Sequence, residues 1–237
     1  SSFVATLILY VIMLLASTWG MLIFLGIRFY RSMYTDEGYL SHTLPVTANQ
    51  LFLSKILVSG VWYLFISIGI GISVVALVVS LMTGLLNIGE LSSVLTQYNG
   101  NIWEFLADAF YELGRTYEEE MGINLLHYGI TLLLTYVAGP FITMVTLFGA
   151  LTIGQLSSKH KGFMGILAYA GVTILSSIIG STVQSAFMFG TNVMSSQSGI
   201  SVSANSVYDI NVITSLLLAA IMYGVSYYIM NKKLNLD

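Results

Sequence analysis

Two adjacent carboxylates interrupt an otherwise apolar stretch near the start of the chain. Asp36 and Glu37 lie in RFYRSMYTDEGYLSHTLPVTANQLFLSKIL, residues 28–57, with tyrosines and a leucine close by. Carboxylates beside rigid apolar side chains suit contact with a partner protein, where the charges pair with Arg or Lys and the apolar groups fill a pocket. A solvated loop with interfacial tyrosines is the alternative interpretation of the same residues.

A second polar feature is a row of small hydroxyl side chains in a later apolar stretch. Residues four apart lie on one face of a helix. Such a row allows helices to pack closely, which is its commoner use, or it lines a route through a membrane. Because a strongly polar amide is rare inside an apolar span, we take this face as the candidate substrate pathway. The row consists of Thr173, Ser177, Ser181 and Ser185, with Gln184 adjacent.

The sequence does not bring together residues for enzyme chemistry. His42, His127 and His160 fall at different loops or interfaces, too far apart to share a metal site. Neither HExxH nor GxSxG occurs, and we expect no charged position within a span that could form a selective ring. We therefore expect a non-enzymatic protein without a metal. An intramembrane enzyme and a passive channel or scaffold are the alternatives.

Composition assigns the chain to a membrane. Of its 237 residues 56% are hydrophobic and 8% are charged, and the mean hydropathy is +0.84. In water such a chain would expose too much apolar surface, so we expect lipids around it. The net charge of −3 is small and scattered, which argues against nucleic acid as a partner. Without cysteine there is no disulfide framework.

Five apolar segments are long enough to cross a bilayer as helices, which need about 20 residues. Only helices and closed barrels satisfy the backbone in hydrocarbon, and the alternating pattern of barrel strands is absent. We therefore predict an all-α, polytopic helical membrane protein with a single transmembrane domain over residues 1–237. The predicted spans are residues 3–27, 51–86, 125–156, 163–187 and 212–230.

Lys and Arg orient the predicted spans, because these residues stay on the cytoplasmic side of short loops. All of them except Arg115 fall in or beside the loops after the first, third and fifth spans. This pattern predicts a cytoplasmic loop at 28–50, an extracellular loop at 87–124, an N-terminus outside and a cytoplasmic C-terminus. An odd number of spans with an outside start fits a complete chain of six helices.

Three local patterns refine these elements. Thr47 and Gln50 form a capping box that starts the second span. Gly139 and Pro140 predict a kink in the third span, either a hinge or a static bend. Polar and apolar residues separate onto two faces over 101–119, which predicts an amphipathic helix on the outer leaflet.

The first loop resembles that of permease subunits in the type-2 exporter family of ATP-binding-cassette (ABC) transporters. The similarity lies in YTDEGYLSHTLPVTANQLFLSKIL, residues 34–57. Weaker similarity lies in IGQLSSKHKGFMGILAYAGV at 153–172 and in YYIMNKKLNLD at 227–237. The resemblance implies the type-2 exporter transmembrane fold in a bacterial plasma membrane.

The resemblance also implies partners. ATP and Mg²⁺ would be bound by separate ATPase subunits, and this chain has no GxxxxGK[ST] phosphate loop of its own. A short helix in the first loop would seat in a groove of the ATPase, and two permease copies, identical or sibling, would form one pathway. With few charges in the spans, we expect amphipathic or apolar cargo, such as a peptide, an antimicrobial or a lipid-like compound. The implied coupling residues are Tyr34, Asp36, Glu37, Gly38, Tyr39 and Leu40.

Overall fold

The regular structure of this protein is α-helical. A computed structural model describes residues 2–35, 47–86, 101–121, 124–157, 160–198 and 205–232. The prediction of an all-α protein is confirmed for these ranges. The helices are α1 (Ser2–Tyr34), α3 (Ala48–Leu86), α5 (Ile102–Met121), α6 (Leu125–Gly154), α7 (Lys161–Ser198) and α8 (Asn205–Lys232).

Five of the described helices are long and apolar enough to cross a membrane. The prediction of a five-span helical membrane protein is therefore confirmed. Helix α5 is not one of the five, and it lies in the segment where the sequence predicts an amphipathic helix. The candidate spans are Val4–Tyr34, Asn49–Leu81, Leu125–Gly154, Lys161–Gly190 and Tyr208–Asn231.

Helix α8 begins earlier than predicted, which places a carboxylate inside a span. The predicted span starts at Val212, but α8 starts at Asn205 and its apolar part includes Asp209. Asp209 is thus an acidic residue within a candidate span, whereas the expectation that no charged position forms a selective ring stays a prediction. Asp209 is the only Asp or Glu in the five candidate spans. A carboxylate there is costly unless other groups bond to it.

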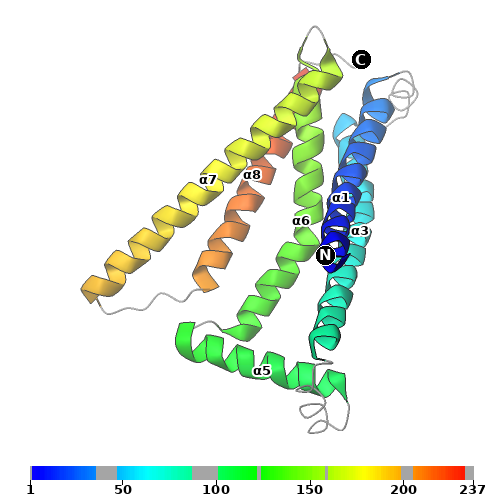
Figure 1. Ribbon diagram of the computed structural model, residues 1–237. Helices are drawn as coiled ribbons and strands as arrows, with labels where there is room; N and C mark the ends of the chain where they lie inside the picture. Colours follow the sequence, from blue (N-terminus) through cyan, green and yellow to red (C-terminus); the bar gives the residue numbers. More distant parts are fainter. Residues whose placement is uncertain are drawn as a thin grey trace.

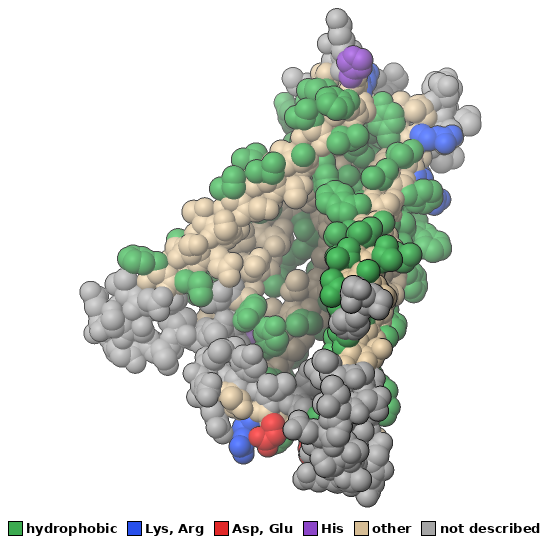
Figure 2. All heavy atoms as spheres, viewed as in Figure 1, with side chains coloured by type: hydrophobic (Ala, Val, Ile, Leu, Met, Phe, Trp, Pro, Cys, Tyr) green, Lys and Arg blue, Asp and Glu red, His purple; other side chains and the backbone are tan. Residues whose placement is uncertain are grey.

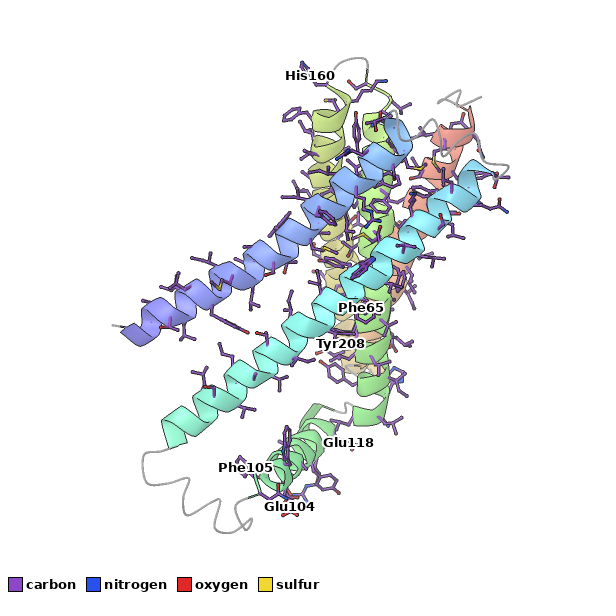
Figure 3. The ribbon with its side chains drawn as sticks, turned by 90° about the vertical axis from the view of Figure 1, so that its right-hand side faces the viewer. Phe65, Glu104, Phe105, Glu118, His160 and Tyr208 are labelled. Atoms are coloured by element: carbon purple, nitrogen blue, oxygen red, sulfur yellow. The ribbon has the colours of Figure 1, made fainter. Side chains whose placement is uncertain are left out.

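The spanning helices converge at one end and spread apart at the other (Figure 1). At the convergent end, side chains of α1, α3, α6 and α8 form one buried core that includes Leu25, Phe52, Met144 and Met230. Toward the other end α7 diverges from α6, and α1 and α3 lean away from α6 (Figure 3).

The two ends of the bundle differ in charge (Figure 2). We call the convergent end the basic end, because Arg28 and Arg31 of α1, Lys55 of α3 and Lys161 of α7 lie there. We call the opposite end the acidic end, because α5 lies there. The side chains described on α5 are rich in carboxylates, with Arg115 as a basic exception: Glu104, Asp108, Glu112 and Glu118.

Local sequence explains how two of the spans begin and bend. The backbone N–H of Gln50 donates to Thr47 Oγ1 (3.3 Å) and that of Thr47 to Gln50 Oε1 (3.1 Å), which confirms the predicted capping box. Pro140 lies midway along α6, where it removes the amide donor for the carbonyl of Tyr136. Helix α6 changes direction about halfway along its length (Figure 1). A hinge function of Gly139 and Pro140 stays a prediction.

Candidate functional site

The segment with most of the predicted coupling residues connects α1 to α3. Asp36, Glu37, Gly38, Tyr39 and Leu40 lie outside the described residues, as does the whole of 36–46. Both ends of this segment are described: α1 ends at Tyr34 just before it, and α3 begins just after it. The side-chain contacts at these two ends determine which other helices would move if the segment moved.

Four aromatic side chains hold the α1 end. Phe29 stacks on Phe148 of α6, with ring centroids 4.0 Å apart and the planes nearly parallel. It also meets Tyr34 and Phe52 edge to face, each at a centroid distance of 5.9 Å. Offset-stacked and edge-to-face pairs are favourable beyond the area that they bury. We call Phe29, Tyr34, Phe52 and Phe148 the aromatic clamp; it joins α1, α3 and α6.

Tyr34 points into the bundle. Its hydroxyl lies 2.8 Å from Thr152 Oγ1 of α6, and Thr152 Oγ1 donates to the carbonyl of Phe148 at 2.8 Å. A hydroxyl has one proton. Because Thr152 gives its proton to the carbonyl, Tyr34 is the donor in the bond between the two side chains. Tyr34 therefore fixes the start of the 36–46 segment to α6.

A second set of contacts holds the α3 end. The hydroxyl of Tyr223 in α8 donates to Asn49 Oδ1, in the first turn of α3. The ring of Tyr223 also lies 5.8 Å from that of Phe52. Both ends of the 36–46 segment are thus tied to the basic-end halves of α6 and α8.

The predicted pathway residues of α7 face a groove between α6, α7 and α8. The groove has a volume of about 460 Å³. Four residues of the predicted face line it, whereas Ser185 is not among its lining residues: Thr173, Ser177, Ser181 and Gln184. Further polar side chains complete the lining: Thr143 and Thr146 of α6, Ser176 of α7, and Asn211, Thr214 and Ser215 of α8.

Several hydroxyls of this groove donate their protons to their own helices. Thr146 donates to the carbonyl of Ile142 (2.8 Å), Ser177 to that of Thr173 (2.9 Å) and Thr214 to that of Ile210 (2.7 Å). A hydroxyl with its proton donated keeps lone pairs that accept hydrogen bonds. We therefore call this site the acceptor groove. Sequence periodicity identified its α7 face, but not the hydroxyls that α6 and α8 contribute.

A second cavity lies between α3, α6 and α8, also with a volume of about 460 Å³. Its lining includes one tyrosine of α3, two of α6 and one of α8, together with Gly139 and Pro140. Asn211 and Ser215 of α8 line both this cavity and the acceptor groove. We call it the tyrosine cavity, after Tyr63, Tyr128, Tyr136 and Tyr208.

Asp209 is not itself a lining residue of the tyrosine cavity, but it bonds to one of the residues that line it. Its Oδ2 is 2.9 Å from His127 Nε2, and its Oδ1 accepts a hydrogen bond from Thr131 Oγ1 at 3.2 Å. Thr131 is itself a lining residue. The sequence reasoning missed Asp209 because the polar stretch NSVYDIN lowers the hydropathy just before the predicted span. A carboxylate within one turn of an apolar span is the signal that identifies it.

Among the described residues, no group of three or more His, Cys, Asp or Glu is arranged to hold a metal ion. The fold defines a polytopic membrane protein with five spanning helices. Comparison with models of known families, with curated proteins and with solved structures finds no match for this chain.

Proposed function

We propose that this protein is the permease subunit of an ATP-driven ABC exporter of the type-2 family, and that it moves amphipathic or apolar cargo out across a bacterial plasma membrane. The aromatic clamp supports this function most directly. The clamp joins α1 and α3, the helices on either side of the 36–46 segment, to α6. Helix α6 in turn lines both cavities.

The coupling follows from these contacts. Separate ATPase subunits bind ATP and Mg²⁺. They contact the loop through Asp36, Glu37, Tyr39 and Leu40, with Gly38 between them. When two ATPases close on ATP, the loop moves. Because Phe29 and Phe52 pack together and Phe29 stacks on Phe148, the basic-end halves of α1, α3 and α6 move as one body. This movement alters the cavities on both sides of α6.

The acceptor groove is the proposed pathway. Ser177, Ser181 and Gln184 provide polar contacts without a full charge, which suits cargo with an apolar body and a polar group. In one chain this groove is lined by α6, α7 and α8. A second permease copy, identical or sibling, completes the pathway. With the basic end in the cytosol, the ATPases bind where the helices converge.

An enzyme is the less favoured alternative, and His127, Asp209 and Thr131 bear on it directly. In a hydrolase triad the imidazole lies between the hydroxyl and the carboxylate and takes the hydroxyl proton. Here the carboxylate lies in the middle, and both His127 and Thr131 bond to it. This order holds a carboxylate in place and does not activate the hydroxyl as a nucleophile.

Charge reversal in the coupling loop tests the proposed function. We expect the double variant Asp36→Lys, Glu37→Lys to insert normally but to lose its ATPase partner. Close charge pairs at interfaces couple by about 1.5 kcal/mol or more, and about 1.4 kcal/mol corresponds to a tenfold change in affinity. Co-purified ATPase and transport-coupled ATP turnover should each fall tenfold or more. The measurement is quantitative co-purification of this chain with candidate ABC ATPase subunits that are co-expressed with it.

The matched control reverses the same charges at the acidic end. Glu104 and Glu118 are exposed on α5, so Glu104→Lys with Glu118→Lys changes the net charge equally. This control should keep the ATPase. Undiminished transport in the Asp36, Glu37 double variant, or equal loss in both variants, would contradict the coupling assignment.

A further inference from the structure

The tyrosine cavity has aromatic walls held in fixed positions. Tyr128 of α6 and Tyr208 of α8 meet edge to face, with centroids 4.8 Å apart and planes at 67°. Tyr136 donates from its hydroxyl to the backbone carbonyl of Ser67 in α3. Gly71 leaves room for this hydroxyl, because a Cβ at that position would lie 2.9 Å from it. Tyr208 lies beside the acidic-end half of α6 (Figure 3).

Several hydroxyls of the same cavity donate their protons within the protein. Ser67 donates to the carbonyl of Leu64 (2.8 Å), Thr135 to that of Thr131 (2.7 Å) and Ser215 to that of Asn211 (2.9 Å). Thr131 and Tyr136 also donate their protons, to Asp209 and Ser67 respectively. These oxygens retain lone pairs. No Lys or Arg is among the described residues that line the cavity.

The charge beside the cavity is negative. The side chain of Asp209 is 38% exposed, so a ligand can approach it. Helix α5 adds carboxylates at this end, including Glu104 and Glu118 (Figure 3), and it contacts the start of α6 where Gly114 meets Leu125. Carboxylates near a low-dielectric cleft raise the local concentration of cations.

From these three features we infer that the tyrosine cavity binds a hydrophobic organic monocation. Aromatic faces attract a cation through the ring quadrupole, the hydroxyl oxygens offer lone pairs, and Asp209 supplies the counter-charge. A volume of about 460 Å³ lies within the about 300–1,000 Å³ of small-molecule sites. A neutral ligand would not use the charge of Asp209, and an anion would be repelled by it. That this cation is exported cargo rests on the proposed function.

Two ions of the same shape and opposite charge test the site. The full chain is placed in lipid nanodiscs, and binding of tetraphenylphosphonium and tetraphenylborate is measured by equilibrium dialysis after subtraction of empty nanodiscs. We expect saturable binding of tetraphenylphosphonium, at least tenfold tighter than that of tetraphenylborate. Equal affinity for both ions, or no saturable binding of the cation, would overturn the inference without any variant.

Variants then locate the binding. Asp209→Asn keeps an oxygen for Thr131 and removes the charge, and Tyr208→Leu removes one aromatic face. Each should weaken binding of the cation at least fivefold. Tyr227→Leu, at an exposed position of the same helix outside the cavity lining, should leave it unchanged. Wild-type affinity in both Asp209→Asn and Tyr208→Leu would place the cation elsewhere.

The outcome also separates this inference from the proposed function. Binding in nanodiscs needs no ATPase. If an ATPase co-purifies with the chain but the cation does not bind, the cavity assignment fails and the exporter stands. If the cation binds but no ATPase associates through residues 36–40, the exporter fails and the binding site stands.

Discussion

Phe148 links the coupling segment to the helix that lines both cavities. Its side chain is 0% exposed and stacks on Phe29 across the α1–α6 contact. Without a hydrophobic driving force between helices in lipid, their association depends on close packing. A cavity in place of this ring removes that packing from both helices. Phe148 therefore matters for stability and, in the proposed mechanism, for coupling.

We expect Phe148→Ala to destabilise the bundle. Replacement of a buried Phe by Ala costs about 3–5 kcal/mol in packed cores, so the thermal unfolding midpoint in detergent should fall by several degrees. Coupled ATP turnover should fall with it. Phe65→Ala is the matched control, because it removes the same atoms from a ring of α3 that is 64% exposed (Figure 3). Equal midpoints for the two variants would show that the clamp does not stabilise the bundle.

Single residues also mark what the sequence predicts well and what it does not. The Thr47 and Gln50 capping box is local, and both of its hydrogen bonds are present. The direction of Tyr34 depends on Thr152, a residue of another helix, which no local pattern reveals. Asp209 falls outside the spans predicted from hydropathy because its carboxylate lowers the local hydropathy, but it lies in α8, where it bonds to His127 and Thr131.

At the scale of helices, the α6–α7 contact depends on two glycines near the basic end. A Cβ on Gly154 of α6 would overlap the backbone N and Cα of Gly165 in α7. Backbone atoms cannot move aside as a flexible side chain does. The absence of a side chain at residue 154 therefore permits this close approach of α6 and α7.

Gly154→Ala should separate α6 from α7. We expect a lower thermal midpoint and weaker coupled ATP turnover. Gly162→Ala is the matched control, because a Cβ there meets no atom within 4 Å. In a helix Ala is favoured over Gly by about 1 kcal/mol, so the control should be as stable as the wild type or more so. A Gly154→Ala protein as stable as Gly162→Ala would contradict the close approach.

The helices themselves were largely predictable, because span length and hydropathy reflect the thickness of a bilayer. The α7 face with Ser177 and Ser181 was predictable as well, since a four-residue repeat follows one side of a helix. The rest of the acceptor groove was not. Thr146 and Thr214 belong to helices whose rotation about their own axes is fixed only by packing against neighbours.

At the scale of the whole molecule, convergence at the basic end concentrates buried side chains near the 36–46 segment. Leu25 of α1, Ile56 of α3, Leu147 of α6 and Met230 of α8 belong to this core. The outer faces of α1 and α3 expose long apolar side chains that lipid or a second copy can cover. Contacts between helices far apart in sequence create this asymmetry, so hydropathy alone does not predict it.

The orientation of the asymmetric bundle is the last prediction, and the coupling mechanism requires it. The chain has no cysteine, so single cysteines can be introduced without background. Trp103 of α5 is 73% exposed at the acidic end, and Leu156, just after α6, is 50% exposed at the basic end. Because basic residues are retained in the cytosol, a membrane-impermeant maleimide should label Trp103→Cys in intact cells and Leu156→Cys only after permeabilisation. Labelling of Leu156→Cys from outside would place residues 36–46 on the cell exterior, where no cytosolic ATPase could reach Asp36 and Glu37.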